Sequence, residues 1–520
     1  MRRRTVLKGI GATTGAAAVG GVAAPGAAAS PAVRAGGDRL PQALTFDQDI
    51  YTVRTDTLTD ANGESVQVTY RFYAPITYVT RPVDATHQSL VISVPVAIDG
   101  KKVDASRAPI VFANWVGGYF PVSVAAATGV GEGVMEMPGG QVLVNNGNDT
   151  NLPKLALAAG YVVVEPGARG RTLVDDGGVH YGTAPAVIVD LKAAVRYLRA
   201  NKGRVPGDTD RIISTGTSAG GAMSALLGAS GGSHLYDTHL TELGAADAGD
   251  GVFATAAWCP IADLEHADMA YEWCWGTTKL ARTGALVDQT LSKELSALFA
   301  DYQASLRIDG LHGYGRLTAR NYDDYLLKTY LWPAATTYLA GLSATARATY
   351  LAANPTIRWD GKQASFTWDE YLAHMGGRNK GVPSFDAFDA STGENNLFGN
   401  GTVSARHFTQ YGLDHDTTGL GTKHLDKDIP GTLDLMNPMH FIQQRNAGRS
   451  RYWWIRLGTS DPHTSLTISS NIAASLGQLG DSVNTAMYWD AGHATNRDPA
   501  AFLSWIAGIT GYHAPGGSRG

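Results

Sequence analysis

Residues 211–227 have the sequence RIISTGTSAGGAMSALL. The β-branched residues at its start predict a strand, and residues 219–227 predict a helix. A G-x-S-x-G pattern centred on Ser218 connects the two. In this context the serine stands on a tight, strained turn with its hydroxyl exposed, and the small flanking residues let the helix and the strand pass close to it. The stretch therefore predicts a nucleophilic serine at the end of a sheet strand.

A second G-x-S-x-G pattern, at residues 228–232, provides an internal comparison. It follows the end of the same helix instead of a strand, in a place where glycines commonly terminate helices. We therefore interpret its serine, Ser230, as structural. The pattern alone is a weak signal, and the position between a strand and a helix gives it meaning.

Further strand and helix patterns alternate on both sides of this stretch. Apolar residues recur at helical spacing in residues 184–201, and unbroken apolar runs are typical of buried strands. This alternation predicts an α/β fold with a mostly parallel sheet that is covered on both faces. The expected strands are residues 65–73, 90–96, 109–115, 161–165, 211–215, 253–258, 452–457 and 485–489, and the expected last helix is 499–509.

Residues 262–429 differ in character from the rest of the chain. They are rich in Tyr, Trp, Gly and Asn and contain few β-branched runs. We interpret them as an insertion of helices and loops, carried on the sheet where a lid or a substrate-shaping domain would lie. The expected organisation is a leader at residues 1–29, a first part of the sheet domain at 41–261, the insertion at 262–429, and a second part of the sheet domain at 430–513.

A glycine pair follows the strand expected at residues 109–115. Gly117 and Gly118 stand where serine hydrolases carry the loop that binds the oxyanion of the tetrahedral intermediate. A bare glycine lets a backbone N–H approach the substrate oxygen to ~3 Å. With the N–H of Ala219, which follows the serine, these glycines form the predicted oxyanion hole. An ordinary glycine turn is the alternative.

The predicted serine needs a base, and the base needs an acid that orients it. His493 follows the last expected strand and is the predicted base, and Asp461 follows the preceding strand and is the predicted acid. Asp490 is a rival acid, but it stands only three residues before His493. His440, in an expected helix, and His180, in a glycine-rich loop without a suitable acid, are weaker candidates for the base. The order serine, aspartate, histidine is that of α/β-hydrolases.

These motifs and their surroundings resemble the bacterial tannases, the tannase and feruloyl-esterase-like group of the α/β-hydrolase superfamily. The resemblance covers most of the chain after the leader, including the insertion. It implies an α/β-hydrolase fold with a lid, hydrolysis of aromatic esters, typically gallate esters, and no metal or organic cofactor. It is strongest in residues 216–221, 259–268, 271–273, 383–386, 393–399 and 437–439, and in the loops of Asp461 and His493.

The resemblance also implies residues that bind the phenolic hydroxyls of the substrate. Lys380 matches a lysine of those tannases, which donates to phenol oxygen, and Glu394 matches a glutamate, which accepts from phenol O–H groups. Without the resemblance, we would interpret both as solvated surface charges.

The third implied binding position departs from the family pattern. His463 stands two residues after Asp461, where an aspartate is expected. A neutral imidazole offers one donor, one acceptor and no full negative charge. We still expect esterase activity despite this difference. It weakens the prediction that the site is strictly specific for gallate.

The leading hypothesis is a secreted serine esterase that hydrolyses gallate- or hydroxybenzoate-type esters through an acyl-enzyme. Its expected partner is a small phenolic ester, without nucleic acid or membrane. A general carboxylesterase and a serine peptidase on the same fold are alternatives. Such peptidases usually carry a large N-terminal domain, whereas a short segment precedes the first expected strand here. A non-catalytic binder on a decayed hydrolase scaffold is disfavoured by the intact Ser218, Asp461 and His493.

The first residues predict export. Arg3 and Arg4 begin a twin-arginine pattern, a weakly apolar run follows, and residues 27–29 form an A-x-A cleavage pattern. A membrane anchor is the alternative. However, the run is rich in Gly and Ala, contains two threonines and is shorter than the ~20 residues needed to cross a bilayer. We expect export by the twin-arginine route to a place outside the cytoplasm.

The net charge and the number of cysteines argue against several further classes of protein. Loss of the leader removes four basic and no acidic residues and takes the formal net charge from −5 to −9. This unclustered acidic balance argues against nucleic acid, whose binding needs basic patches. Cys259 and Cys274 are the only cysteines, too few for a disulfide framework or a cysteine-based zinc site. One bridge between them and two free thiols both remain open.

Overall fold

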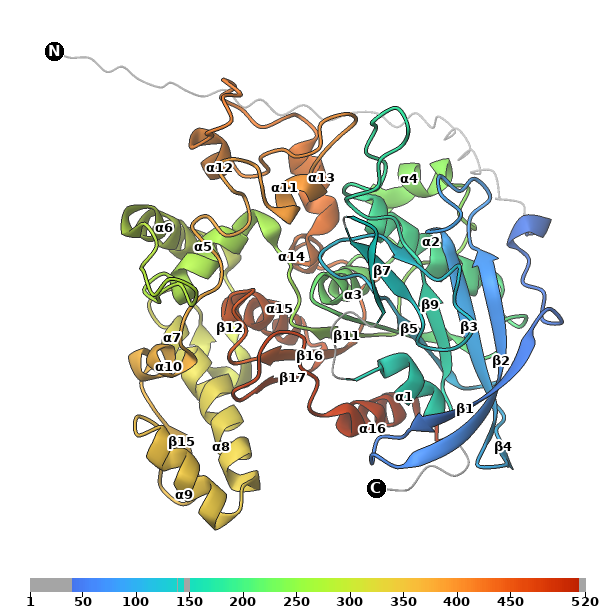
Figure 1. Cartoon of the computed structure of the whole chain (residues 1–520), viewed down its shortest axis with the longest axis horizontal. Coiled ribbons are helices and arrows are strands. Elements are labelled where there is room, and N and C mark those ends of the chain that lie inside the picture. Colours follow the sequence, from blue (N-terminus) through green and yellow to red (C-terminus); the bar gives the residue numbers. More distant parts are fainter. Residues whose placement is uncertain (1–39, 138, 145–149, 514–520) are drawn as a thin grey trace, which may run out of the picture. The chain divides into compact units, whose positions relative to one another are not determined.

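The computed structural model describes residues 40–137, 139–144 and 150–513, so the leader expected at residues 1–29 lies outside the described residues. A ten-stranded sheet forms the centre of this part (Figure 1). Its strand order is β1-β2-β3-β9-β5-β10-β11-β16-β17, and β4 pairs with β3. The strands are β1 (Thr52–Thr59), β2 (Ser65–Thr77), β3 (Ser89–Ile98), β4 (Lys101–Lys102), β5 (Pro109–Ala113), β9 (Val162–Pro166), β10 (Asp208–Thr217), β11 (Ala254–Trp258), β16 (Tyr452–Gly458) and β17 (Ser482–Tyr488).

Strand direction divides the sheet into two parts. Six neighbouring strands of the sheet run parallel to one another: β9, β5, β10, β11, β16 and β17. The other edge, β1, β2 and β3, is antiparallel and joins β9 through β3. β5, β9 and β11 are buried along their whole length, as is typical of parallel strands covered on both faces. Because parallel strands end at the same edge, the segments after β5, β10, β16 and β17 lie near one another. The α/β fold class predicted from the sequence is confirmed.

Helices cover both faces of the sheet (Figure 1). On one face α2, α3, α14 and α15 pack in a row, and α3 rests on β10 and β11. On the other face lie α1 and α16, where Phe502 of α16 packs against Trp258 and Trp454 of the sheet. Their bounds are α1 (Leu152–Ala158), α2 (Ala186–Ala200), α3 (Ala219–Ala229), α14 (Pro438–Gln443), α15 (Leu466–Gln478) and α16 (Pro499–Thr510).

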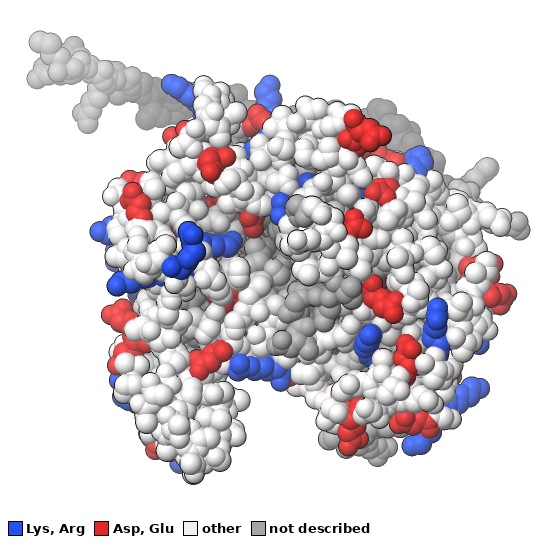
Figure 2. All heavy atoms as spheres, in the orientation of Figure 1, with Lys and Arg blue, Asp and Glu red and all other residues white. Residues whose placement is uncertain are grey.

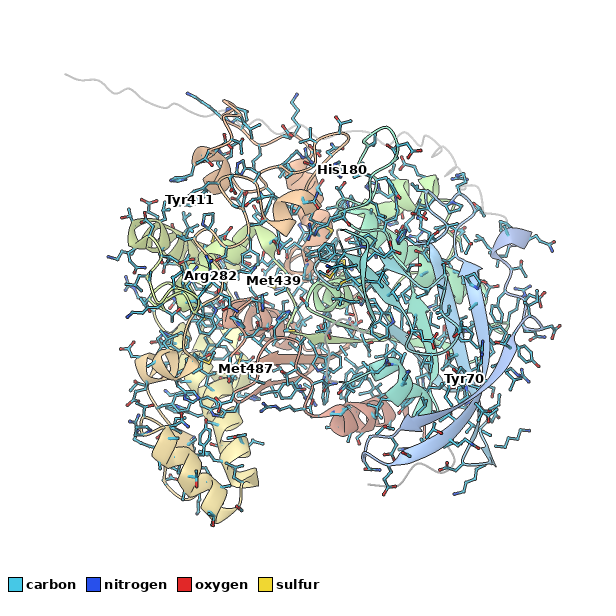
Figure 3. The ribbon with its side chains drawn as sticks, in the orientation of Figure 1. Tyr70, His180, Arg282, Tyr411, Met439 and Met487 are labelled. Atoms are coloured by element: carbon cyan, nitrogen blue, oxygen red, sulfur yellow. The ribbon has the colours of Figure 1, made fainter. Side chains whose placement is uncertain are left out.

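A long helical segment connects β11 to β16. Figure 3 places Arg282 and Tyr411 of this segment on the opposite side of the picture from Tyr70 of β2. Its elements are α5 (Leu264–Trp275), α6 (Gln289–Leu306), β12 (Asp309–Gly310), β13 (Gly315–Arg316), α7 (Tyr322–Leu326), α8 (Trp332–Gly341), α9 (Ala344–Ala353), β14 (Arg358–Trp359), β15 (Ala364–Ser365), α10 (Trp368–Met375), α11 (Gly393–Leu397), α12 (Gln410–Asp414) and α13 (Ile429–Met436). Outside the segment lie α4 (Asp237–Glu242) and a small sheet of β6 (Val122–Ser123), β7 (Val134–Met137) and β8 (Gln141–Val144).

Aromatic side chains form the centre of this inserted segment. Trp273 of α5 packs against Phe299 of α6, Tyr322 of α7 and Trp368 of α10, with ring centres 5.2, 5.6 and 5.7 Å apart. Large rings fill space between short helices with few residues. The aromatic composition that distinguishes this segment in the sequence therefore reflects its own packed interior.

Two elements of the sheet domain have no clear sequence signal. β1 exposes most of its side chains, so its sequence lacks the apolar alternation that predicts a strand. α15 is buried along most of its length, so no apolar stripe distinguishes one of its faces. Strand ends also differ from expectation: the strand expected at residues 485–489 is Ser482–Tyr488, and the one expected at 109–115 ends at Ala113.

The surface carries charges of both signs. Figure 2 shows acidic and basic side chains interspersed on the viewed face. Among the residues described, no helix is both long and apolar enough to cross a membrane.

Candidate active site

Ser218 occupies the turn between β10 and α3. Its backbone has φ 61° and ψ −123°, and a positive φ is rare for a residue with a side chain. The N–H of Ser218 donates to the carbonyl of Trp258 at 3.0 Å, and its own carbonyl accepts from the N–H of Ile261 at 3.2 Å. These two bonds hold the strained turn in place, and the residue stays half-buried.

The glycines around Ser218 are required by close backbone contacts. A Cβ on Gly216 would lie 2.3 Å from the carbonyl oxygen of Gly220, and a Cβ on Gly221 would lie 2.4 Å from that of Trp258. Both distances are below the 3.0 Å that real Cβ contacts respect. The small residues of the sequence pattern therefore let the strand, the turn and the helix approach one another.

A series of hydrogen bonds connects the residues predicted as nucleophile, base and acid. Nε2 of His493 lies 2.9 Å from Oγ of Ser218, and Nδ1 of His493 lies 2.8 Å from Oδ2 of Asp461. Asp461 is fully buried, and its other carboxylate oxygen accepts the N–H of His463 at 2.9 Å. The fixed carboxylate orients the imidazole so that Nε2 faces the serine hydroxyl.

Asp490, the rival acid, has different partners. Its Oδ1 lies 2.6 Å from Nε2 of His374 in α10, and its Oδ2 accepts the hydroxyl of Tyr350 in α9. Asp490 therefore ties the loop of His493 to the inserted segment and does not contact the imidazole of His493 itself.

Cys259 and Asp461 both act on the electrostatics of His493. Burial lowers the pKa of the imidazole, but Cys259 and Asp461 outweigh this effect and raise the pKa above that of a free histidine. Cys259 follows β11, is buried as a free thiol, and accepts the N–H of Ala494 at its sulfur at 3.3 Å. The shift shows that both neighbours stabilise the imidazolium that forms when His493 takes up the serine proton. Since Cys274 is also a free thiol, no disulfide joins the two cysteines.

The predicted oxyanion donors have free backbone N–H groups. Within the described residues, no hydrogen bond takes up the N–H of Gly117, Gly118 or Ala219. The two glycines follow β5, and Ala219 opens α3, where the helix dipole favours negative charge. Free donors at the ends of the neighbouring strands β5 and β10 have the composition of an oxyanion hole.

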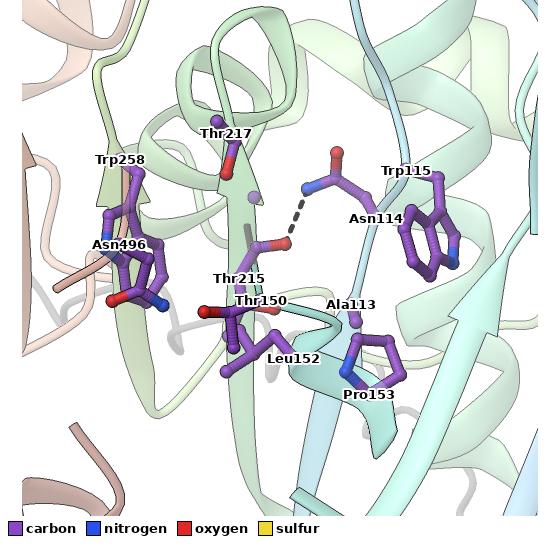
Figure 4. Close-up of a pocket in the computed structure, with 11 residues that line it drawn as sticks. Ala113, Asn114, Trp115, Thr150, Leu152, Pro153, Thr215, Thr217, Trp258 and Asn496 are labelled. Atoms are coloured by element: carbon purple, nitrogen blue, oxygen red, sulfur yellow. Dashed lines mark hydrogen bonds between the residues drawn. The ribbon is translucent and has the colours of Figure 1, made fainter. Parts of the chain in front are cut away.

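Asn114 fastens the loop after β5 to the nucleophile turn (Figure 4). Its side-chain amide donates to the carbonyl of Thr215 at 2.9 Å, the bond drawn in Figure 4, and to the carbonyl of Gly220 at 3.1 Å. Beside it lies a cavity of about 30 Å³ that Thr217 and Trp258 also line. This volume holds a water molecule and is too small for an aromatic ring.

Arg171 connects the glycine loop to the inserted segment. Its backbone N–H donates to the carbonyl of Tyr119 at 2.9 Å, and its Nε donates to that of Gly118 at 2.8 Å. Gly118 and Tyr119 both have positive φ, 53° and 57°, which costs a glycine little but strains Tyr119. The two bonds hold the loop in this conformation. Nη1 of the same side chain donates to Asn396 of α11 at 2.8 Å. One guanidinium thus links the glycine loop to the helix that carries Glu394.

Lys380 lies on a loop that α5 holds in place through two buried carboxylates. Asp268 accepts the N–H of Phe385 at 2.8 Å, and Glu272 accepts Nη1 of Arg378 at 2.7 Å. Arg378 in turn donates through Nε to the carbonyl of Lys380 at 2.8 Å. Nζ of Lys380 lies 3.5 Å from the centre of the Phe385 ring. The loop is therefore fixed on both sides of Lys380.

The residues that the resemblance assigns to ring binding are close enough to act on one another. Burial lowers the pKa of Lys380, and the charges of Glu394 and Asp461 oppose that shift. Burial, His493 and Lys380 lower the pKa of His463, so its imidazole is neutral at pH 7. Glu394 is half-buried, and its carboxylate has no hydrogen-bond partner within the described part of the chain. The ammonium of Lys380 and the carboxylate of Glu394 thus lie near Asp461 and His493, which we call the acid–base pair.

Other residues of the sequence patterns make structural contacts. Oγ of Ser230 donates to a main-chain carbonyl of α3 at 2.6 Å, and His440 pairs with Asp434 at 2.8 Å. By contrast, Arg171 and Cys259 contact the site, although no sequence pattern indicates a role there for either residue. No motif identifies them, because their contacts depend on how distant loops fold together.

Comparison with known proteins shows relatives along most of the chain. The BD-FAE family model matches residues 139–299, and no curated protein matches the chain. Tannin acyl hydrolase in complex with ethyl gallate is 35% identical, with a TM-score of 0.76. Tannin acyl hydrolase in complex with 3,4-dihydroxybenzoate is 35% identical, with a TM-score of 0.77, and the tannase of Fusobacterium nucleatum is 35% identical, with a TM-score of 0.75.

Each of these three comparisons covers 90% of this chain and 99% of the related chain. The likeness therefore extends over the sheet, the inserted segment and the loops that carry Ser218, Asp461 and His493. The chain belongs to the bacterial tannase family of α/β-hydrolases and is a carboxylic ester hydrolase.

Proposed function

We propose that this chain is a serine esterase that hydrolyses phenolic carboxylic esters through an acyl-enzyme on Ser218. The hydrogen-bonded series of Asp461, His493 and Ser218 on a strained turn carries the proposal. The ammonium of Lys380 and the free carboxylate of Glu394 supply polar partners for a hydroxylated ring.

Acylation follows from this geometry. Oγ of Ser218 attacks the carbonyl carbon of the ester while Nε2 of His493 takes up the serine proton. Asp461 accepts the hydrogen bond of Nδ1–H and stabilises the imidazolium. The N–H groups of the glycine loop and of Ala219 stabilise the oxyanion. The intermediate then breaks the ester C–O bond, and the alcohol leaves with the proton from His493.

Deacylation repeats the same steps with water as the nucleophile. His493 accepts a proton from the water, which attacks the carbonyl carbon of the acyl-serine. The second tetrahedral intermediate releases Ser218, which regains its proton from His493, and the carboxylic acid product leaves. No group other than side chains, backbone N–H groups and water takes part in these steps.

The acyl group is proposed to be a hydroxylated benzoate. Related enzymes are complexed with ethyl gallate and 3,4-dihydroxybenzoate, which carry such rings. Lys380 can donate to a phenol oxygen, and Glu394 can accept from a phenol O–H. A neutral His463 supplies no negative charge beside them, so the preference shifts toward rings with fewer hydroxyls than gallate.

A panel of four substrates tests this function: methyl gallate, methyl ferulate, the methyl ester of a short aliphatic acid, and a peptide amide. Methyl esters keep the leaving group constant, so differences in kcat/KM report the acyl group. We expect the phenolic esters to exceed the aliphatic ester and the amide to remain intact. Equal kcat/KM for all esters would favour the general carboxylesterase, and cleavage of the amide would favour the peptidase.

We also propose that the chain is exported by the twin-arginine route and acts outside the cytoplasm. This proposal rests on the sequence of residues 1–29 alone.

A further inference from the structure

Cys259 is a buried thiol placed directly beside the acid–base pair. It follows β11 with φ 37°, and only 2% of the residue is exposed. Its sulfur, one imidazole nitrogen of His493 and one carboxylate oxygen of Asp461 all lie within 4.8 Å of one another. The proposed esterase mechanism gives this thiol no step. A thiol, an imidazole and a carboxylate are, however, the three side-chain groups that bind zinc-like cations in proteins.

We propose that Cys259, Asp461 and His493 form a binding site for a soft divalent cation such as Zn²⁺ or Cd²⁺, and that occupancy of this site inhibits the enzyme reversibly. A tetrahedral zinc lies about 2.3 Å from sulfur and about 2.0–2.2 Å from nitrogen and oxygen. Ligand atoms that already lie within 4.8 Å of one another reach these distances through small side-chain movements.

Charge balance favours a divalent cation in this buried place. Cys259 binds the cation as a thiolate, with its proton released to solvent, and Asp461 contributes a carboxylate. Two negative ligands and one neutral imidazole neutralise a charge of +2. The soft sulfur ligand favours Zn²⁺ and Cd²⁺ over Mg²⁺ or Ca²⁺, which prefer oxygen ligands.

Inhibition follows from which imidazole nitrogen the cation takes. Nδ1 of His493 is the nitrogen that faces Asp461, at 2.8 Å, so a cation shared by these two residues binds Nδ1. The imidazole then carries its proton on Nε2, the nitrogen that faces Ser218 at 2.9 Å. A protonated Nε2 cannot accept the serine proton, so acylation stops. Removal of the cation restores the active tautomer.

The imidazole of His493 is the part of this site that solvent reaches. The side chain of His493 is 20% exposed, although Asp461 is fully buried. A small hydrated cation can therefore approach from the side on which the ester substrate binds, and substrate should slow its entry.

Zn²⁺ titration of the chelator-treated enzyme tests the proposal through activity. Wild type, Cys259→Ser and Cys274→Ser are each compared with their own metal-free rate. We expect Cys259→Ser to raise the Zn²⁺ concentration for half inhibition roughly tenfold or more, because serine is a poor ligand for this cation. Cys274→Ser is the matched control, since Cys274 is the other buried free thiol, and its Zn²⁺ response should equal that of wild type. Equal half-inhibition in Cys259→Ser and wild type would overturn the proposal.

A spectroscopic readout keeps the test independent of the proposed esterase function. Co²⁺ bound by a thiolate gives a sulfur-to-cobalt charge-transfer absorption. The Ser218→Ala variant lacks the proposed nucleophile and keeps all three ligands. We expect this variant to show the band with one Co²⁺ per chain, and the double variant Ser218→Ala/Cys259→Ser to lose it. Absence of the band in Ser218→Ala would refute the cation site, whatever the substrate panel shows.

Discussion

His463 is the residue most directly connected to the choice of acyl group. Its ring centre lies 4.6 Å from that of His493, and burial, His493 and Lys380 together keep its imidazole neutral at pH 7. A neutral imidazole accepts at most one hydrogen bond, whereas a carboxylate accepts several and carries a charge. A ring with three neighbouring hydroxyls therefore has one poorly matched partner in this pocket.

We predict that His463→Asp raises kcat/KM for methyl gallate relative to methyl benzoate by roughly one to two powers of ten. A hydroxyl without a partner costs ~1–3 kcal/mol, and ~1.4 kcal/mol corresponds to a factor of ten. Glu394→Ala should remove the preference for hydroxylated rings. The measurement compares methyl benzoate, 4-hydroxybenzoate, protocatechuate and gallate across wild type and both variants. An unchanged ranking in all three proteins would show that the pocket does not distinguish ring hydroxyls.

The free energy of unfolding depends on pH through Glu165, a buried residue of β9. Its buried carboxylate accepts the indole N–H of Trp115 at 2.8 Å and the backbone N–H of Gly131 at 2.9 Å. Burial nevertheless raises its pKa to about 7. The folded-state pKa thus exceeds the value of ~4.3 in an unfolded chain, so folding favours the protonated form. This contribution to the free energy of unfolding is complete below the unfolded pKa and is lost as the pH rises through about 7.

We predict that Glu165→Gln flattens the decline of Tm between about pH 5 and about pH 8. The neutral amide keeps an oxygen that accepts from Trp115 and has no proton to lose. Calorimetry of wild type and variant across this range measures the difference. Glu64→Gln, which changes an exposed carboxylate before β2, serves as the control and should follow wild type. A Glu165→Gln curve as steep as that of wild type would disprove this account of the pH dependence.

At the scale of elements, the loop after β5 depends on a residue from the loop after β9. Arg171 holds the carbonyls of Gly118 and Tyr119 and reaches Asn396 of α11. We predict that Arg171→Met lowers kcat about ten- to hundredfold. The side-chain length and the backbone bond to Tyr119 are kept, while the side-chain donors to Gly118 and Asn396 are lost. Asn396→Ala removes the bond from Arg171 to α11, together with the bond that Asn396 donates to the carbonyl of Ser404, and should mainly raise KM for hydroxylated esters.

The check for Arg171 is a set of kcat and KM values for methyl gallate and methyl benzoate, with Tm recorded for each variant. A purely structural role would lower Tm and leave kcat of the folded enzyme intact. A folded Arg171→Met enzyme with the kcat of wild type would therefore exclude the proposed positioning role.

Sequence patterns predict those parts of the molecule whose signals are local. The parallel strands β5, β9 and β11 are mostly apolar and buried along their whole length. Ser218, Asp461 and His493 each stand just after a strand, so topology alone brings them to one edge. The role of Arg171 has no such signal, because it bonds to Asn396, 225 positions away in sequence. Cys259 likewise acquires its neighbours only when the ends of β11, β16 and β17 meet.

For the molecule as a whole, the inserted segment contacts both loops of the acid–base pair. Tyr271 of α5 donates to the carbonyl of Pro462 at 2.7 Å, next to Asp461. His374 of α10 bonds to Asp490 at 2.6 Å, three residues before His493. The segment that carries the proposed ring-binding residues therefore also supports the geometry of the acid and the base.

Export concerns the entire chain and has its own test. We predict that changing Arg3 and Arg4 together to Lys retains the protein in the cytoplasm, because the twin-arginine route recognises the arginine pair. Cell fractionation and N-terminal sequencing check this, and the mature wild-type protein should begin near Ser30. Normal export of the double variant would point to another route.

The central claim, that Ser218 is the nucleophile of a phenolic ester hydrolase, is tested most directly by reaction with a serine-phosphonylating inhibitor followed by peptide mass mapping. We predict one adduct per chain, on the peptide that contains Ser218, with loss of methyl ester hydrolysis in proportion to labelling. Ser230 should remain unlabelled, and Ser218→Ala should take up no label and have a kcat lower by several powers of ten. Labelling at another serine, or Ser218→Ala with most of its activity, would contradict the claim.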